Sequence, residues 1–134
     1  VSLAGAAERP GSDAVGTDAG DLAGVASLGV AVTDNPAEAL SAADAVIDFT
    51  TPAATVALAK EAARAGIVHV VGTTGLSAAD SASLDAEARQ TVVVQSGNMS
   101  LGVNLLAQFV RQAARALDAS FDIEILEEET QERR

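Results

Sequence analysis

The sequence predicts an α/β domain built on a parallel sheet. Short apolar runs rich in valine and isoleucine alternate with segments of about ten or more residues that have a helical apolar period. Residues typical of helix caps and turns stand at the junctions between them. Strands that are separated by helices are joined by right-handed crossovers and therefore lie parallel.

The first third of the chain has the weakest pattern. Residues 1–7 are predicted as a short strand, and residues 11–27, rich in Gly, Asp, Ala and Ser, as a surface loop with one turn of helix. Residues 28–33 are compatible with a strand. Asn35-Pro36 then opens a short helix, because proline is favoured at the first helical position.

The middle of the chain holds three strand-like runs, at residues 45–49, 67–71 and 91–94. The first two are continuous apolar runs, as expected of strands buried on both faces. The helix between them begins after the cap Thr51 and ends before Gly66, a residue type that commonly terminates helices.

Two helices are predicted after residue 76. Ser77 and Asp80 form a capping box for a helix that ends near Arg89. A longer helix begins near Ser100, with apolar residues three and four positions apart. Residues 121–126 then alternate in hydropathy like a strand, and the charge run 127–134 is typical of a solvated tail.

Composition excludes several classes of protein. The chain has 134 residues, with 19 acidic and 8 basic side chains and a net charge of −11. This acidic balance argues against nucleic-acid binding. No cysteine and one histidine are present, which excludes a disulfide framework, a cysteine nucleophile and a multi-histidine metal site, so no metal is expected.

The same composition predicts where the protein works. No apolar run approaches the roughly 20 residues that span a bilayer, and no secretory signal is visible. We therefore expect a cytoplasmic protein without a membrane segment. Aromatic residues are only 2 % of the chain, so the core is expected to consist mainly of Ala, Val, Leu and Ile.

Three strand-to-helix junctions are candidate ligand sites, at residues 48–52, 72–75 and 96–100. Ligands of parallel sheets bind beyond the carboxyl ends of the strands, and small residues let backbone N–H groups approach a phosphate or an amide. Each junction alone is equally compatible with a simple tight turn. Three of them at one sheet edge favour a ligand crevice.

Glu8 and Arg9 close the first predicted strand. In dinucleotide-binding folds an acid at such a position binds the ribose hydroxyls, and a nearby arginine can bind a 2′-phosphate. The alternative is a surface ion pair of little energetic value. No Gly-x-Gly-x-x-Gly turn follows any strand, so in a dinucleotide-binding fold the first strand and its glycine turn are expected upstream of Val1.

Two other polar residues lie in or at the end of apolar strands. His69 interrupts the run 67–71, and a hydrogen-bonded core histidine is favoured over a catalytic one. Asp48 ends the run 45–49, and we expect it to cap the following turn rather than act as an acid or base.

Four strings in this order resemble the cofactor domain of the dihydrodipicolinate reductase family. They are Val-Ile-Asp-Phe-Thr at 46–50, Gly-Thr-Thr-Gly at 72–75, Asn-Met-Ser-Leu-Gly-Val-Asn at 98–104 and Asp-Ile-Glu-Ile at 122–125. Residues 5–12 and 16–20 also fit, so the resemblance covers nearly the whole chain up to Glu127. It implies an incomplete Rossmann-like dinucleotide-binding domain at 1–126, with 127–134 as the start of a missing substrate domain.

The resemblance also implies an activity and a site. The family reduces dihydrodipicolinate (4-hydroxy-tetrahydrodipicolinate), a dicarboxylate of lysine and diaminopimelate biosynthesis, with NADPH or NADH. Glu8 and Arg9 would bind the adenosine ribose and its 2′-phosphate. Two further groups of residues would contact the nicotinamide of the coenzyme: Gly72, Thr73 and Thr74, and Ser96, Gly97, Asn98 and Met99. Thr74 would also lie near the substrate. Met99 stands where family members commonly carry phenylalanine.

The sequence departs from the family after residue 126. The histidine and lysine motif that supplies the family's acid does not follow, so no catalytic residue is assigned in this chain. We also expect the domain that forms the family's homotetramer to be missing. We therefore expect a reductase fragment with little activity alone. The alternatives are a catalytically inert nucleotide-binding module and a different oxidoreductase with a similar sheet.

Overall fold

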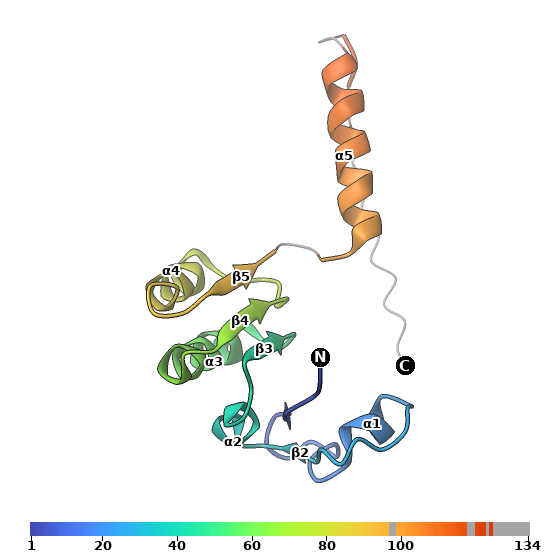
Figure 1. The fold of residues 1–134 in the computed structure, drawn as a ribbon. Helices are drawn as coiled ribbons and strands as arrows, with labels where there is room; N and C mark the ends of the chain where they lie inside the picture. Colours follow the sequence, from blue (N-terminus) through green and yellow to red (C-terminus); the bar gives the residue numbers. More distant parts are fainter. Residues whose placement is uncertain (97–98, 118–119, 123, 125–134) are drawn as a thin grey trace. The chain divides into compact units, whose positions relative to one another are not determined.

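The computed structural model describes residues 1–96, 99–117, 120–122 and 124. The chain divides into two compact units, Val1–Gly97 and Asn98–Arg134. Within the described residues, the first unit contains all the strands, and the second contains one long helix (Figure 1). The alternating order of strands and helices in the first unit confirms the α/β class.

The main sheet has three parallel strands in the order β3 (Ala45–Asp48), β4 (Val68–Val71) and β5 (Val93–Gln95). Asp48 pairs in register with Val71, and Val71 with Gln95. The three carboxyl ends therefore lie side by side at one edge of the sheet. This arrangement confirms the predicted parallel sheet.

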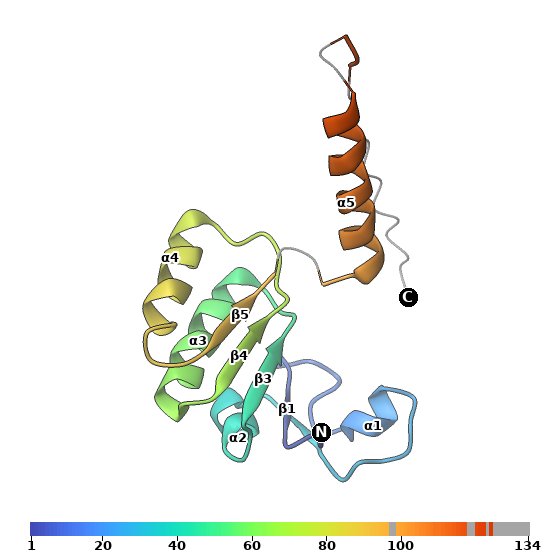
Figure 2. The same cartoon turned by 45° about the horizontal axis from the view of Figure 1, so that its top comes forward.

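Both long helices of the first unit, α3 (Pro52–Ala65) and α4 (Ala78–Glu87), cover the same face of this sheet (Figure 2). Successive right-handed crossovers between strands that advance in one direction place the helices on one side. Ala59 of α3, Val71 of β4 and Leu84 of α4 form the core between the layers.

The predicted helix ends are confirmed. The Thr51 hydroxyl accepts a hydrogen bond from the Ala54 N–H, and Gly66 ends α3 in the left-handed conformation, with φ 70°. Ser77 and Asp80 form the full capping box of α4. Local sequence thus determines where both helices begin and where α3 ends.

The prediction that the run 45–49 is buried on both faces is wrong. The burial of β4 alternates, with His69 and Val71 buried and the residues between them partly exposed. On β3, Ile47 points away from the helices and is 71 % exposed. Within residues 1–96 both long helices lie on one face of the sheet, and neither covers the face on which Ile47 lies.

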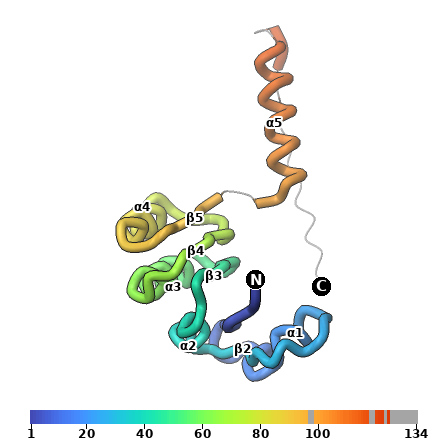
Figure 3. Tube along the Cα trace, viewed as in Figure 1, coloured from blue at the N-terminus to red at the C-terminus, as the bar shows by residue number. Residues whose placement is uncertain are grey.

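A second, two-stranded parallel sheet joins β1 (Ala6–Ala7) and β2 (Val32–Thr33). Both strands are shorter than predicted, and they form a ladder separate from the main sheet. The helices of this region are short, α1 (Ala19–Leu22) and α2 (Pro36–Leu40), and the trace in Figure 3 follows the chain from β2 through α2 into β3.

The long loop before β2 is closed by one carboxylate. Asp18 caps α1 by accepting the Gly20 N–H at 2.8 Å, and it also accepts the N–H groups of Leu28 at 2.9 Å and Val30 at 3.0 Å. Hydrogen bonding, led by the bond from the Leu28 N–H, lowers the pKa of Asp18 to about 2. One ionised side chain therefore holds both ends of the loop together.

The second unit contains α5 (Leu101–Ala116), which begins beside Ser100, as predicted, and has no buried residue. The strand predicted at 121–126 is not formed at Phe121, Asp122 or Glu124. Its other residues and the tail 127–134 lie outside the described residues. No helix in the described ranges is long and apolar enough to cross a membrane.

Candidate functional site

The carboxyl ends of β3 and β4 form two corners that are tied to each other. The first corner leads from Asp48 into α3, and the second leads from Gly72 into the loop before α4. The Gly72 N–H donates to the Asp48 carbonyl at 2.8 Å, and the Thr50 N–H donates to the Thr73 hydroxyl at 3.0 Å. Two of the three predicted junctions thus lie together.

A buried network of polar side chains lies directly beneath these corners. The Asp48 carboxylate contacts His69 Nε2 at 3.0 Å and accepts the hydroxyls of Thr50 at 2.6 Å and Thr73 at 3.3 Å. The Thr55 hydroxyl donates to that of Thr73 at 2.8 Å. Asp48 is 1 % exposed, and Thr55 and His69 are 0 % exposed. Both corners therefore rest on one carboxylate.

Hydrogen bonding keeps Asp48 ionised. Burial by itself raises the pKa of this carboxyl, but hydrogen bonds led by those from His69 and Thr50 outweigh burial and lower the pKa to about 2. An ionised Asp48 assigns His69 the tautomer with hydrogen on Nε2. The other ring nitrogen, Nδ1, is buried and has no partner.

These contacts change the expected roles of both residues. The Asp48 carboxylate does not cap the following turn by accepting the Thr50 N–H, because that N–H donates to the Thr73 hydroxyl instead. His69 is a core histidine with only one of its two nitrogens bonded. The pair supports the corners from below, and neither side chain reaches solvent.

The two adjacent threonines of the second corner play different parts. The Thr73 side chain is 5 % exposed, and its hydroxyl already donates to Asp48 and accepts from Thr50 and Thr55. It has no hydrogen-bonding capacity left for a ligand. Thr74 is exposed, and among the described residues no acceptor receives the backbone N–H of Thr73 or Thr74. This corner therefore offers two backbone donors and the Thr74 hydroxyl.

Glu8 and Arg9 follow β1, as predicted. The Glu8 N–H extends the ladder by donating to the Thr33 carbonyl at 3.0 Å, and the Glu8 carboxylate accepts the Arg9 N–H at 2.6 Å. Both residues are exposed, and across the described part of the chain their side chains form no ion pair with each other. The guanidinium group of Arg9 thus remains accessible to solvent.

The third predicted junction is only partly described. Ser96 comes directly after β5, whereas Gly97 and Asn98 lie outside the described residues. Met99 is exposed and belongs to the second unit. The four residues 96–99 therefore stay a prediction.

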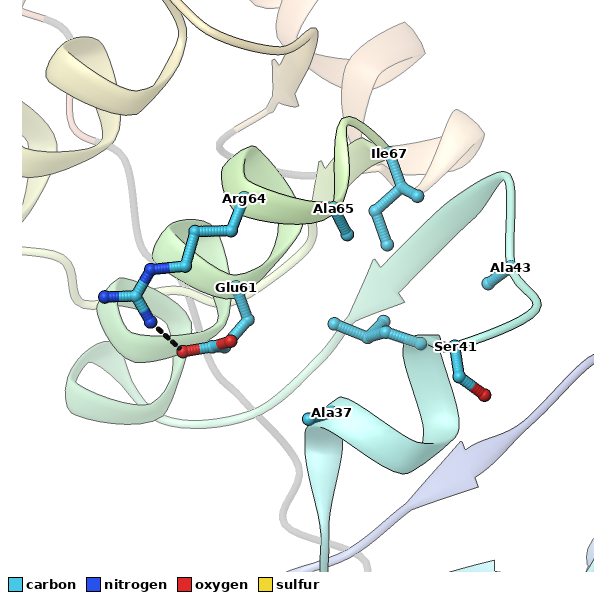
Figure 4. Close-up of a pocket in the computed structure, with 8 residues that line it drawn as sticks. Ala37, Ser41, Ala43, Glu61, Arg64, Ala65 and Ile67 are labelled. Atoms are coloured by element: carbon cyan, nitrogen blue, oxygen red, sulfur yellow. Dashed lines mark hydrogen bonds and ion pairs between the residues drawn. The ribbon is translucent and has the colours of Figure 1, made fainter.

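A separate surface hollow lies at the opposite end of the sheet, between α2 and the end of α3 (Figure 4). Ala43, which precedes β3, and Ile67, which precedes β4, line it, and an exposed Arg64–Glu61 ion pair of 2.6 Å stands beside them. Because ligands of parallel sheets bind at the carboxyl edge, this hollow is not part of the candidate site. No metal-binding cluster of His, Cys, Asp or Glu occurs within the described ranges.

Sequence reasoning missed Thr55 as a site-supporting residue and underrated Asp48 and His69. One signal was present in the sequence. When two parallel strands end in register, the last residue of one strand lies on the same face as the residue two positions before the end of the other. Asp48 is the last residue of β3 and His69 lies two positions before the end of β4, so the two are diagonal neighbours. Thr55 gave no such signal, because its role depends on how α3 packs.

The parallel strands, their flanking helices and the donors at the carboxyl edge define a Rossmann-like nucleotide-binding domain. Residues 1–99 match the family described as dihydrodipicolinate reductase, N-terminus, and the chain belongs to this family.

Curated relatives agree with this assignment. The chain is 57 % identical over 127 residues to a 4-hydroxy-tetrahydrodipicolinate reductase of Ruegeria pomeroyi, covering 95 % of this chain and 47 % of the relative. It is 60 % identical over 128 residues to one of Rhizobium meliloti, with the same coverage. The chain thus spans about half the length of the curated relatives it matches.

A solved structure shows a similar fold. The amine dehydrogenase from Mycobacterium smegmatis matches with a TM-score of 0.55 and 32 % sequence identity, over 69 % of this chain and 30 % of that one.

Proposed function

We propose that this chain is the coenzyme-binding part of a 4-hydroxy-tetrahydrodipicolinate reductase and binds NADPH or NADH at the carboxyl edge of β3 and β4. The two relatives of that name described above are 57 % and 60 % identical to it. The observation that carries the proposal is the pair of unpaired backbone donors at Thr73 and Thr74, on a corner that the Asp48 network holds in place. Such donors fit the amide group of a nicotinamide.

Each remaining residue has a part in this proposal. The coenzyme, when bound, supplies the hydride that reduces the substrate. Glu8 accepts the hydroxyls of the adenosine ribose, and the accessible Arg9 binds a 2′-phosphate, which favours NADPH. Gly72, Thr73 and Thr74 form the corner at which the nicotinamide binds, with Thr74 also close to the substrate. The nicotinamide pocket is completed by Ser96, Gly97, Asn98 and Met99.

The activity belongs to the whole protein. Its substrate is a small dicarboxylate, and we expect a cytoplasmic homotetramer without a nucleic-acid partner. None of these 134 residues is assigned as the proton donor that reduction requires. Isolated, the chain is expected to oxidise NADPH in the presence of fresh substrate at a negligible rate, and clear turnover would contradict that expectation.

Calorimetric titration of the chain with NADPH and NADH tests the proposal. Both coenzymes are expected to bind, and Arg9→Ala is expected to weaken NADPH about tenfold or more while leaving NADH unchanged, because it removes a charge-assisted contact to the phosphate. Arg64→Ala is the matched control, since Arg64 is an exposed arginine at the far end of the sheet. If neither NADPH nor NADH binds, the proposal is overturned and an inert module is favoured.

A further inference from the structure

Gly72 is in contact with an aromatic ring. A Cβ atom added at Gly72 would lie 2.5 Å from Cζ and 2.6 Å from Cδ1 of Phe49, distances that real Cβ atoms do not adopt. The backbone of Gly72 does not have a positive φ, so its conformation does not require glycine. The ring of Phe49 thus explains why this position has no side chain.

Phe49 itself is an unusual surface residue. It follows Asp48 at the carboxyl end of β3, and it is 67 % exposed although one face of its ring rests on Gly72. The chain has only three phenylalanines and neither tryptophan nor tyrosine. A flat apolar surface therefore stands at the ligand edge, against Gly72, the residue that precedes Thr73 and its unpaired N–H.

We propose that Gly72 is glycine in order to seat the Phe49 ring, and that the exposed face of this ring stacks against the pyridine ring of the coenzyme. The proposal rests on the proposed function and adds to it a contact residue, Phe49. It also gives Gly72 a different role. Gly72 acts by positioning Phe49, whereas the backbone donors to the ligand come from Thr73 and Thr74.

Physical chemistry favours this arrangement. A planar heteroaromatic ring binds well when one face is covered by an aromatic side chain and its amide substituent is held by directional donors. A phenylalanine that is already braced loses little conformational freedom when a ligand stacks on it. Replacing such a stacking residue typically weakens binding about tenfold or more.

The seat is tested without any ligand by a double-mutant cycle. Gly72→Ala is expected to lower the thermal unfolding midpoint by several degrees in the unaltered chain, because the added methyl group displaces the ring. In the Phe49→Ala background the same change is expected to have almost no effect. Equal shifts in both backgrounds would overturn the role of Gly72 as a seat.

The stacking contact is tested by titrating reduced nicotinamide mononucleotide and AMP separately against the chain and following ligand signals by saturation-transfer NMR. Phe49→Leu is expected to weaken the pyridine nucleotide about tenfold, and Phe49→Tyr to change it less than about twofold. AMP binding should not depend on residue 49. Val92→Ala, at the opposite end of the sheet and similarly exposed, is the control.

Each remaining outcome has a definite meaning. Unchanged binding by Phe49→Leu, or a loss confined to AMP, overturns the stacking role while the proposed function stands. Absence of binding by the unaltered chain overturns the stacking role together with the proposed function, and the double-mutant cycle still decides the role of Gly72. If Gly72→Ala weakens the pyridine nucleotide equally with and without Phe49, glycine serves the ligand directly and the proposal is wrong.

Discussion

The carboxylate of Asp48 and the imidazole of His69 form a hydrogen bond of 3.0 Å, with both side chains completely shielded from solvent. The pair joins β3 to β4 on the face that the helices cover. Through its second oxygen, Asp48 also holds the hydroxyls of Thr50 and Thr73. The stability of the core and the shape of the ligand corner thus depend on the same carboxylate.

Asp48→Asn is expected to destabilise the chain by about 3 kcal/mol or more, because breaking a buried, hydrogen-bonded charge pair leaves polar groups unpaired. The asparagine amide would also place its own N–H hydrogens against groups that donate to the Asp48 carboxylate in the unaltered chain. Urea unfolding at pH 7 measures the effect. Asp85→Asn on the exposed surface of α4 is the control, with an expected change below about 0.5 kcal/mol. Equal losses in the two variants would contradict the role of Asp48.

The His69 position should tolerate a donor better than an apolar side chain. His69→Gln retains an N–H that can reach Asp48, whereas His69→Leu leaves Asp48 Oδ2 without its partner. We expect His69→Leu to cost about 2 kcal/mol more free energy of unfolding than His69→Gln. A more stable leucine variant would show that the hydrogen bond contributes nothing.

Stability is expected to fall in acid. The pKa of Asp48 is about 2 in the folded chain against an ordinary value of 3.8, so the folded state binds its proton less tightly than the unfolded state. This depressed pKa contributes at most about 2 kcal/mol, present above about pH 4 and lost as the pH falls through 2. Asp18 shifts in the same direction.

Urea unfolding of the unaltered chain and of Asp48→Asn at pH 6, 4 and 3 isolates the share of Asp48. The difference between the two proteins should narrow as the pH falls, because protonation removes the same charge as the substitution. A difference that stays constant from pH 6 to pH 3 would rule out the assigned pKa.

The helix caps illustrate what the sequence alone can predict. Thr51, Gly66 and Ser77 were all identified from residue type and spacing, because capping depends on neighbours within one helical turn. The uncovered sheet face at Ile47 could not be identified in this way. An apolar run looks the same whether one or both of its faces are covered, and that depends on which elements pack nearby.

The candidate site was predictable to a similar degree. The order of the motifs located the Gly72 corner, since the carboxyl ends of parallel strands meet at one edge. Residue type suggested that both Thr73 and Thr74 face a ligand. Only the packing of α3, which brings Thr55 to Thr73, shows that one hydroxyl is already fully used.

Asp18→Ala is expected to open the loop that precedes β2. The amides of Leu28 and Val30 donate to this carboxylate, and losing bonds to an ionised group should accelerate their hydrogen exchange about tenfold or more. Amides of β4 should not change. Asp21→Ala, at an exposed acid of α1, is the control. Unchanged exchange at both loop amides would contradict the assigned role.

The outer edge of β3 is expected to promote self-association. Within the described residues β3 pairs only with β4, and its exposed Ile47 lies beside an unpaired row of backbone groups. Sedimentation should show a mean mass that rises with concentration, and Ile47→Lys should reduce that rise. Ala57→Lys, at an exposed position of α3, should not. A monomer at every concentration would refute this expectation.

The role of the Thr73 and Thr74 backbone donors can be measured directly by two-dimensional ¹H–¹⁵N NMR during titration with NADPH. The amide signals of Thr73, Thr74 and Phe49 are expected to shift progressively and to saturate, while signals at the hollow between α2 and α3 stay in place. If the corner amides do not move, or if the shifts gather at that hollow instead, the chain does not hold its coenzyme where the unpaired donors lie.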